Sequence, residues 1–444
     1  MIYNRLIVAA IGFIRLEPYD GKLSRTVLRG GKDSNALLLP DYASVEMLYH
    51  PEYAGKPLAV GGDPEARHGI VLTANYIAKR SGVKTGMALW QAKQVCPDLI
   101  FVPPRMDLYL KFSSMLREIY SEYTNQVEPY GCDEAWLDVT DSFSLKGDGR
   151  KIAEEINRRV KKELGITVSI GISWNKIFAK LGSDYKKPDG ITEFNRTNYR
   201  ELIWKLPVSD LLYVGRSTNR TLQKYGIRTI GELARTDPSF LERQLGKMGL
   251  VIYSFANGWD DSPVSVEGYQ APIKSIGNST TTPRDLENDQ DVQIILMALA
   301  ESVAARLRKH GFKCNVVSIS IRDNGLFHFS RQRKLQDPTD ITDEIMSAAY
   351  QLFRENYHWP RPIRSLGIRA DDLVMGQVPV QLDLFMNEQR REKQEKLDRA
   401  VDDIRRRFGY HSVQRAFMYQ DKILSSLDAQ GSHTVHPVGY FNGR

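Results

Sequence analysis

Alternation between apolar and polar positions predicts strands in two separate parts of the chain. Ile166 to Ser173 is rich in β-branched residues, and Val316 to Ile321 alternates with a period of two, as expected for strands with a buried face. Apolar residues three and four positions apart predict helices over about 107–119, 152–164, 292–310 and 342–357. Because helices and strands interleave in both parts, we predict an α+β protein.

The first 48 residues carry the weakest pattern. Leu6 to Ile14 is apolar but too short to span a bilayer, and no clear small-residue cleavage site follows it. It is predicted to be a strand or an extension. A further short strand is predicted at Arg25–Leu28 before the break at Gly30 and Gly31, and a helix is predicted to start near Tyr42.

Length and charge narrow the class of protein. A chain of 444 residues is expected to form two to four domains. Its formal charge of +7 favours a polyanionic partner such as nucleic acid. The three cysteines, Cys96, Cys132 and Cys314, are too far apart for a zinc motif or a disulfide framework, which fits a reducing cytoplasm.

One segment, Tyr130–Asp138, places two acidic residues side by side in an apolar stretch. Neighbouring residues on a plain strand point to opposite faces, so Asp133 and Glu134 would bury one charge there. A turn after Gly131 is the better explanation, because both side chains can then lean toward one cleft and share a divalent cation. Two carboxylates that close repel each other, and a hard cation removes the conflict. A solvated hairpin corner would show the same residues.

Two further regions carry features suited to nucleic acid. Residues 206–262 predict a helix, a glycine turn and a second helix around Gly215 and Gly226, and such turns present backbone N–H groups to phosphates. On a later strand, Arg331 and Arg333, with Lys334, are predicted to form a basic rim for a sugar-phosphate backbone.

The last part of the chain combines an apolar peptide with a charged helix. Gln381–Phe385 places Leu384 and Phe385 in an otherwise polar stretch, and exposed apolar anchors on such a segment usually bind a partner. Packing of this tail on its own domain is the alternative. The helix predicted over Glu388–Phe408 is highly charged and is interpreted as a solvated face.

Several short segments together resemble the Y-family DNA polymerases of the DNA polymerase IV type, over roughly residues 25–420. They occur in that family's order, which makes the resemblance specific. The segments are Tyr42–Glu46, Thr73–Tyr76, Asp133–Asp138, Gly171–Lys176, Lys187–Pro188, the turns at Gly215 and Gly226, and Gln381–Phe385. The resemblance implies an α+β multidomain fold, a right hand of palm, fingers and helical thumb with helix-hairpin-helix turns, followed by an α+β little-finger domain.

The resemblance also implies how the chain is divided. The expected parts are an N-terminal extension (1–24), a palm strand and start (25–42), fingers (43–104), the palm with its carboxylate site (105–200), the thumb (201–262), a linker (263–272), the little finger (273–372) and a tail with a clamp-binding peptide (373–444). The sequence assigns no role to residues 1–24 or 421–444.

In this family paired carboxylates hold two Mg²⁺ ions, so the resemblance assigns metal binding and catalysis to Asp133 and Glu134. The ions would activate the primer 3′-hydroxyl and neutralise the triphosphate. Tyr42 resembles the steric gate, whose ring occupies the space that a ribose 2′-hydroxyl would need. The positions that hold the incoming triphosphate match Thr73, Tyr76, Lys79 and Lys187. Many relatives carry arginine in place of Lys79, and lysine keeps the charge without the bidentate fork.

The third metal carboxylate of the family has no direct match. A gapless comparison places Leu37 where the family has an aspartate, and leucine cannot bind Mg²⁺. If Arg25–Leu28 is the first strand, Asp33 becomes the metal ligand, with Asp41 as the second candidate. The alternative is that the carboxylate has been lost, which should cost several kcal/mol of transition-state stabilisation.

Two functions therefore stay open. The first is a template-directed, error-prone DNA polymerase that extends a primer 3′ end in translesion synthesis during DNA repair. The second is a non-catalytic paralogue that binds DNA and the sliding clamp. A nucleotide enzyme with a related palm, such as a cyclase, would lack the Gly215 turn and the Gln381–Phe385 peptide.

The resemblance also implies partners and a location. Primer-template DNA would contact Gly215, Gly226, Arg331 and Arg333. Deoxynucleoside triphosphates would enter the palm, and the sliding clamp would bind the peptide through Gln381, Leu382, Leu384 and Phe385. A cytoplasmic monomer without membrane contact is expected.

Overall fold

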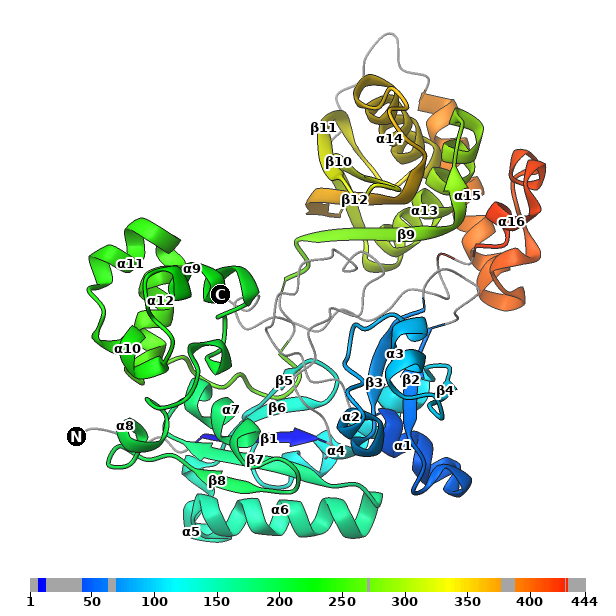
Figure 1. The fold of residues 1–444 in the computed structure, drawn as a ribbon. Coiled ribbons are helices and arrows are strands. Elements are labelled where there is room, and N and C mark those ends of the chain that lie inside the picture. The colour runs from blue at the N-terminus through cyan, green and yellow to red at the C-terminus, as the bar shows by residue number, and fades with distance from the viewer. Residues whose placement is uncertain are drawn as a thin grey trace. The chain divides into compact units, whose positions relative to one another are not determined.

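The computed structural model describes residues 42–62, 69–269, 272–376, 388–427 and 429, together with the backbone of 7–12 (Figure 1). They form two compact units, the first containing the described residues up to 269 and the second those from 272 onward. Within these ranges no helix is long and apolar enough to cross a membrane.

The first unit is built on a five-stranded sheet in the order β5-β6-β1-β7-β8. These strands are Val127–Tyr130, Glu134–Asp138, Ile7–Gly12, Val168–Ser173 and Ile191–Glu193. All neighbouring pairs are antiparallel except β7 and β8. The helices around this sheet are α4 (Met106–Ser121), α5 (Phe143–Lys146), α6 (Gly149–Leu164), α7 (Lys176–Tyr185) and α8 (Tyr199–Leu202).

The predicted alternation along β6 separates two hydrophobic cores. Ala135 and Leu137 pack with α4 and α6, whereas Trp136 packs with residues of α7. Figure 1 shows α6 running along the sheet. The indole nitrogen of Trp136 donates to the carbonyl of Lys176 at 3.0 Å, so strand and helix are fixed to each other next to the acidic pair.

The strand β1 confirms the first of the two alternatives predicted for Leu6–Ile14, a strand or an extension. Ile7–Gly12 lies between β6 and β7, with Ile11 opposite both Glu134 and Ser169. An unbroken apolar run of this kind suits a strand in the middle of a sheet. The strand predicted at Arg25–Leu28 lies outside the described residues.

A smaller sheet in the order β3-β2-β4 follows the helix α1 (Tyr42–Tyr49). Its elements are β2 (Leu58–Gly61), β3 (Val71–Ala74), α2 (Tyr76–Arg80), α3 (Leu89–Val95) and β4 (Ile100–Val102). The Asn75 side chain joins α2 to β2 and to the segment before β2, because its oxygen accepts from the N–H groups of Ala78 and Leu58 and its nitrogen donates to the Lys56 carbonyl. The start of α2 is thereby fixed on the sheet.

Four helices complete the first unit: α9 (Arg216–Lys224), α10 (Ile230–Arg235), α11 (Pro238–Leu245) and α12 (Lys247–Ala256). The chain turns between α9 and α10 at Gly226, whose φ of +78° favours glycine. Thr229 and Glu232 form a capping box at the start of α10. The predicted helix, glycine turn and helix are confirmed here.

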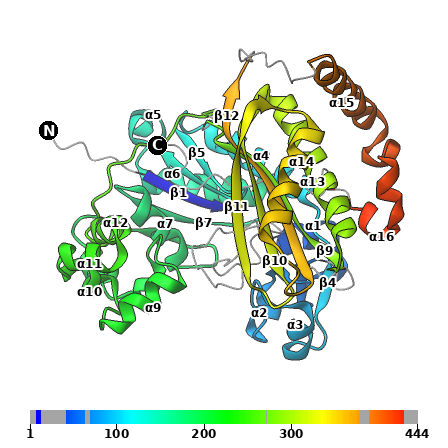
Figure 2. The same cartoon turned by 90° about the horizontal axis from the view of Figure 1, so that it is seen from above.

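The second unit has an antiparallel sheet in the order β11-β10-β12-β9. Its elements are β9 (Ser275–Leu286), α13 (Asp289–His310), β10 (Phe312–Asp323), β11 (His328–Thr339), α14 (Thr342–Asn356), β12 (Ile363–Met375), α15 (Glu388–Phe408) and α16 (Lys422–Ser425). In Figure 2, α13 and α14 lie along one side of the sheet and α15 lies beyond them.

The helix α15 corrects the prediction of a tail after residue 373. Arg308 of α13 is 7% exposed and binds Asp398 and Asp402 of α15, while Glu301 binds Arg405 at 3.0 Å with both side chains 6% exposed. Farther along, Met418, Leu424 and Ala429 lie in the core of the unit. Most of the predicted tail is therefore an integral layer of this unit.

Arg308→Ala should detach α15. Removing one partner of a buried ion pair leaves the others charged and uncompensated, at a cost of about 3–5 kcal/mol. We expect a lower melting temperature for the second unit and new proteolytic cleavage between residues 388 and 408. Arg406→Ala is the matched control, because its pair with Asp403 on the same helix is exposed and should contribute under about 1 kcal/mol. Equal effects of the two changes would contradict this account.

Candidate active site

The acidic pair lies where β5 turns into β6, as the sequence predicted. Tyr130 is opposite Glu134 in the ladder, so only Gly131, Cys132 and Asp133 form the turn. Gly131 has a φ of +81°, a conformation that glycine adopts most easily. Asp133 and Glu134 are only 4% and 5% exposed, which rules out the solvated hairpin corner.

Burial makes this pair electrostatically unfavourable. Both carboxylate oxygens of Asp133 are buried and accept no hydrogen bond from the described part of the chain. Burial, and then the charge of Glu134, raise the pKa of Asp133 well above its ordinary value. Burial likewise raises the pKa of Glu134 to about 7, although the charge of Lys180 opposes this shift. Such a site favours a bound cation.

A charged network on and after α7 continues from Glu134. It contains Lys187, which the sequence analysis predicted, and Lys180 and Asp184, which it missed. Lys180 lies 3.4 Å from Glu134 and 2.7 Å from Asp184, and Lys187 lies 2.5 Å from the other oxygen of Asp184. Burial lowers the pKa of Lys187, and the charge of Asp184 opposes this shift. The carboxylate of Asp184 holds the two cations together, because it is paired with both. The four-residue spacing of Lys180 and Asp184 was the available signal.

Tyr42 is fully buried at the start of α1. Its ring stacks on that of Tyr109 with centroids 3.8 Å apart, and its hydroxyl lies 3.9 Å from the sulfur of Cys132 in the acidic turn. Tyr109 in turn donates to Glu46 at 2.6 Å, and Arg105 donates to both oxygens of Glu46. The sequence analysis included Glu46 in a motif but missed Arg105 and Tyr109, which are far from it in sequence.

Three predicted nucleotide-binding residues lie on the strand β3 of the smaller sheet and on the helix α2 that follows it. Thr73 is on β3 and 1% exposed, and its hydroxyl makes no hydrogen bond within the described ranges. Tyr76 begins α2, and the ammonium group of Lys79 lies 5.4 Å from the centre of its ring. Thr73 and this helix are thus consecutive along one strand-to-helix connection.

The donor set suits Mg²⁺, since this ion commonly takes one or two carboxylates and completes its shell with water and phosphate oxygens. The unsatisfied oxygens of Asp133 beside Glu134 fit that requirement. No group of three metal-binding side chains occurs among the described residues. The two candidates for a third ligand, Asp33 and Asp41, lie outside them, and β1 carries no acidic residue.

The predicted DNA contacts are spread over both units. Gly215 precedes α9 as its N-cap residue, and Gly226 forms the following turn. Arg331 and Arg333 are on β11, where Arg333 donates to both oxygens of Glu355 at 2.6 Å. This ion pair neutralises part of the positive charge of the predicted basic rim. The Gln381–Phe385 peptide lies outside the described residues.

Two family models match the chain. The model of the impB/mucB/samB family matches residues 41–184, and the model of that family's C-terminal domain matches residues 273–384. The first match therefore contains Tyr42, Asp133 and Glu134 and excludes Asp33.

Curated relatives cover most of the chain. A DNA polymerase IV from Acetivibrio thermocellus is 51% identical over 386 residues, which are 87% of this chain and 97% of the relative. A DNA polymerase IV from Moorella thermoacetica is 38% identical over 378 residues, or 84% of this chain and 93% of the relative.

A solved structure supports the fold. A Y-family DNA polymerase chimera of Dbh and Dpo4 matches with a TM-score of 0.67 and 23% identity, over 84% of this chain and the whole of that chain. The predicted α+β polymerase fold is therefore confirmed.

Asp133→Asn should stabilise the metal-free protein at pH 8. Because the folded state raises the pKa of Asp133 above its ordinary value of 3.8, the unfolded chain loses this proton first, and wild-type stability falls as the pH rises above that value. The neutral amide removes this loss. We expect a melting temperature in EDTA about 2–4 °C higher than wild type at pH 8.

The difference in melting temperature between Asp133→Asn and wild type should shrink at pH 5, which is closer to the pKa of Asp133 in the unfolded chain. The exposed Asp141 follows the same hairpin, and Asp141→Asn should leave the melting temperature unchanged at both pH values. A destabilised Asp133→Asn protein at pH 8 would show that this carboxylate is not under electrostatic strain.

Proposed function

Since this chain belongs to the impB/mucB/samB family, as a Y-family DNA polymerase IV, we propose that Asp133 and Glu134 form the site at which it extends a primer. The family assignment supports the first of the two functions that the sequence left open, because DNA polymerase IV is a translesion DNA polymerase. The observation that carries the proposed site is the buried Asp133 carboxylate, whose two oxygens accept no hydrogen bond from the described residues.

The parts of the fold then take the roles of a polymerase hand. The five-stranded sheet and its helices are the palm, and the smaller sheet with α1, α2 and α3 is the fingers. The helices α9 to α12 are the thumb, and the second unit is the little finger. Compared with the division expected from the sequence, the palm also contains the strand β1, and the little finger also contains α15 and α16.

Asp133 and Glu134 would hold two Mg²⁺ ions, with Asp33 or Asp41 as a third ligand. When bound, the ions neutralise the triphosphate and activate the primer 3′-hydroxyl. Burial raises the pKa of Glu134, and the positive charge of Lys180 opposes this rise and so favours the anionic form. Lys187, held by Asp184, adds positive charge on the same side of the network.

The fingers would hold the phosphates of the incoming deoxynucleotide. The buried hydroxyl of Thr73 can donate to a phosphate oxygen, and Tyr76 and Lys79 at the start of α2 supply a second donor and a cation. The ring of Tyr42, fixed by its stack on Tyr109, would exclude a 2′-hydroxyl. Deoxynucleotides are then selected by a side chain that cannot move aside.

DNA and clamp contacts complete the proposal. The thumb turn at Gly226 presents backbone N–H groups to the phosphates of primer-template DNA, and Arg331 adds a cation from the little finger. The Gln381–Phe385 peptide would bind the sliding clamp between two anchored elements, since β12 ends at Met375 and α15 begins at Glu388. A monomer in the cytoplasm stays a prediction.

Asp133→Asn and Glu134→Gln should each reduce primer extension with Mg²⁺ and deoxynucleotides by at least about 10³-fold, because each removes a charge that stabilises the transition state. Binding to a primer-template duplex, measured by fluorescence anisotropy, should change little. Asp33→Asn and Asp41→Asn identify the third ligand, since only the true ligand should give a comparable loss. Asp141→Asn is the control, and extension by Asp133→Asn at the wild-type rate would refute the site.

Tyr42→Ala should reduce discrimination against ribonucleotides. Removing the ring opens space for the 2′-hydroxyl, so kcat/KM for a ribonucleotide should rise relative to the matching deoxynucleotide by about 100-fold. Tyr49→Ala at the half-exposed end of the same helix controls for general effects on α1. Unchanged discrimination would exclude Tyr42 as the steric gate, even if extension itself persists.

A further inference from the structure

The helix α15 exposes a row of apolar side chains. Leu397, Ile404 and Phe408 are 55%, 38% and 73% exposed, and Val401 between them is half-buried. Their spacing of four, three and four residues is that of the a and d positions in a coiled-coil heptad. Side chains at this spacing lie on one face of the helix, so they form a continuous apolar stripe.

This stripe does not hold α15 on its own unit. A different face of the helix does so, through the ion pairs of Asp398 and Asp402 with Arg308 and of Arg405 with Glu301. The four stripe residues are absent from the hydrophobic core of the unit. An apolar seam of this length on a helix that is already anchored is a surface available to another chain.

The charges beside the stripe indicate its partner. In the heptad set by Leu397 and Ile404 as d positions, Lys393 and Arg407 occupy g positions. Both are exposed, and neither makes an ion pair within the described part of the chain. A second copy packed on this stripe would bring its own Lys393 and Arg407 against these cations, whereas a helix with acidic flanks would form ion pairs with them.

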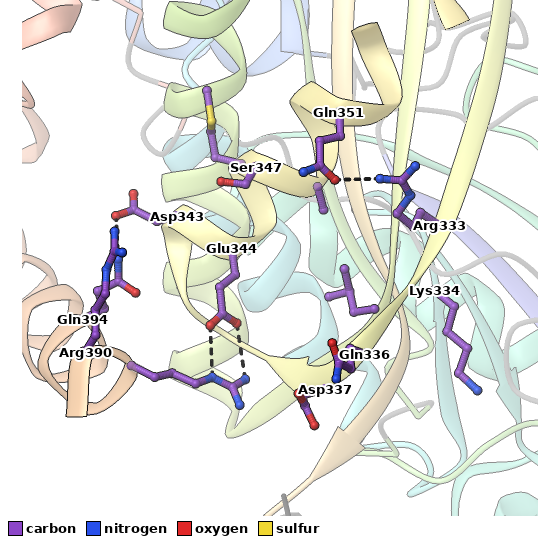
Figure 3. A pocket seen from close by; sticks show the side chains of 14 residues that line it. Arg333, Lys334, Gln336, Asp337, Asp343, Glu344, Ser347, Gln351, Arg390 and Gln394 are labelled. Atoms are coloured by element: carbon purple, nitrogen blue, oxygen red, sulfur yellow. Dashed lines mark hydrogen bonds and ion pairs between the residues drawn. The ribbon is translucent and has the colours of Figure 1, made fainter. Parts of the chain in front are cut away.

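The stripe leads into the cavity shown in Figure 3, between β11, α14 and α15. Arg390 and Gln394 of α15, which precede Leu397 on the same face, line it. It has a volume of about 820 Å³ and an apolar part made by Leu335, Met346 and Ala348.

Two acids of the cavity are already paired, Glu344 with Arg391 and Asp343 with Arg415. Lys334, which is exposed, makes no ion pair within the described ranges and adds a cation to the lining, on the same strand as Asp337. The cavity can therefore take the end of a helix that has an apolar face and an acidic flank.

We propose that the outer face of α15, together with this cavity, is a docking surface for an acidic amphipathic helix of another protein. The stripe supplies the apolar contact, and Lys393 and Arg407 select the acidic flank. This surface shares no residue with the Gln381–Phe385 peptide or with the proposed polymerase site, so the proposal neither requires nor tests the roles of those residues.

The full-length protein can be titrated into a fluorescein-labelled synthetic helix of about four heptads, with Leu at a and d and Glu at e and g. A second helix with Lys at e and g is the matched probe. We expect the acidic probe to bind in the micromolar range, and at least about tenfold more tightly than the basic one, because the flanking charges of α15 are positive.

Variants locate the binding. Leu397→Ser with Ile404→Ser should weaken the acidic probe at least about tenfold, while Ile423→Ser, a 56% exposed apolar residue of α16, should not. Lys393→Glu with Arg407→Glu should reverse the preference between the two probes, which a loss of folding cannot do. Deleting Gln381–Phe385 should leave the binding unchanged.

Four results would overturn the proposal. They are equal binding of the two probes, binding that survives Leu397→Ser with Ile404→Ser, loss of binding when Gln381–Phe385 is deleted, and absence of binding by wild type. Sedimentation of wild type as a dimer that these two serines dissociate would assign the stripe to a second copy instead. Pelleting with phosphatidylserine vesicles, abolished by the same serines, would assign it to a lipid surface.

Discussion

The first unit depends on keeping two adjacent carboxylates out of water. A three-residue turn at the end of β5 leaves Asp133 and Glu134 almost no choice of position, because Tyr130 and Glu134 are already paired in the ladder. Ionising a buried carboxylate without hydrogen-bond donors is costly. The surrounding fold meets that cost only in part, through Lys180 beside Glu134, and gives the oxygens of Asp133 no hydrogen bond from the described residues.

This constraint explains why α7 serves both packing and charge. Its residues Ile177 and Phe178 belong to a hydrophobic core with Trp136, and the Trp136 indole is tied to the helix by a hydrogen bond. Lys180 is one turn further along the same helix, so packing places its ammonium group next to Glu134. A side chain so fixed loses little additional entropy when it binds a charge, and the site is preorganised by the core.

The parts that the sequence predicted correctly are those with a local signal. The hairpin follows from Gly131 and the alternation around it, and the turn at Gly226 follows from glycine between two helical patterns. Contacts between distant residues had no such signal. Tyr42 stacks on Tyr109 and Glu46 binds Arg105, although all strands of the smaller sheet lie between these partners in the sequence. A strand was one of the two alternatives predicted for Leu6–Ile14, but its position between β6 and β7 had no local signal, because these partners come more than a hundred residues later.

The charged helix α15 shows why a periodic pattern can predict a helix and still misplace it. Charge usually marks the solvated side, and here the acidic and basic residues at 398, 402 and 405 face α13 instead. Buried ion pairs add little net stability compared with apolar contacts, but they penalise a shifted register, because a misaligned pair leaves charges buried and unpaired. If α15 were attached through its apolar stripe, it would be held as firmly, but the stripe itself would then be buried. Attachment through charge fixes the position of α15 and leaves Leu397, Ile404 and Phe408 at the surface.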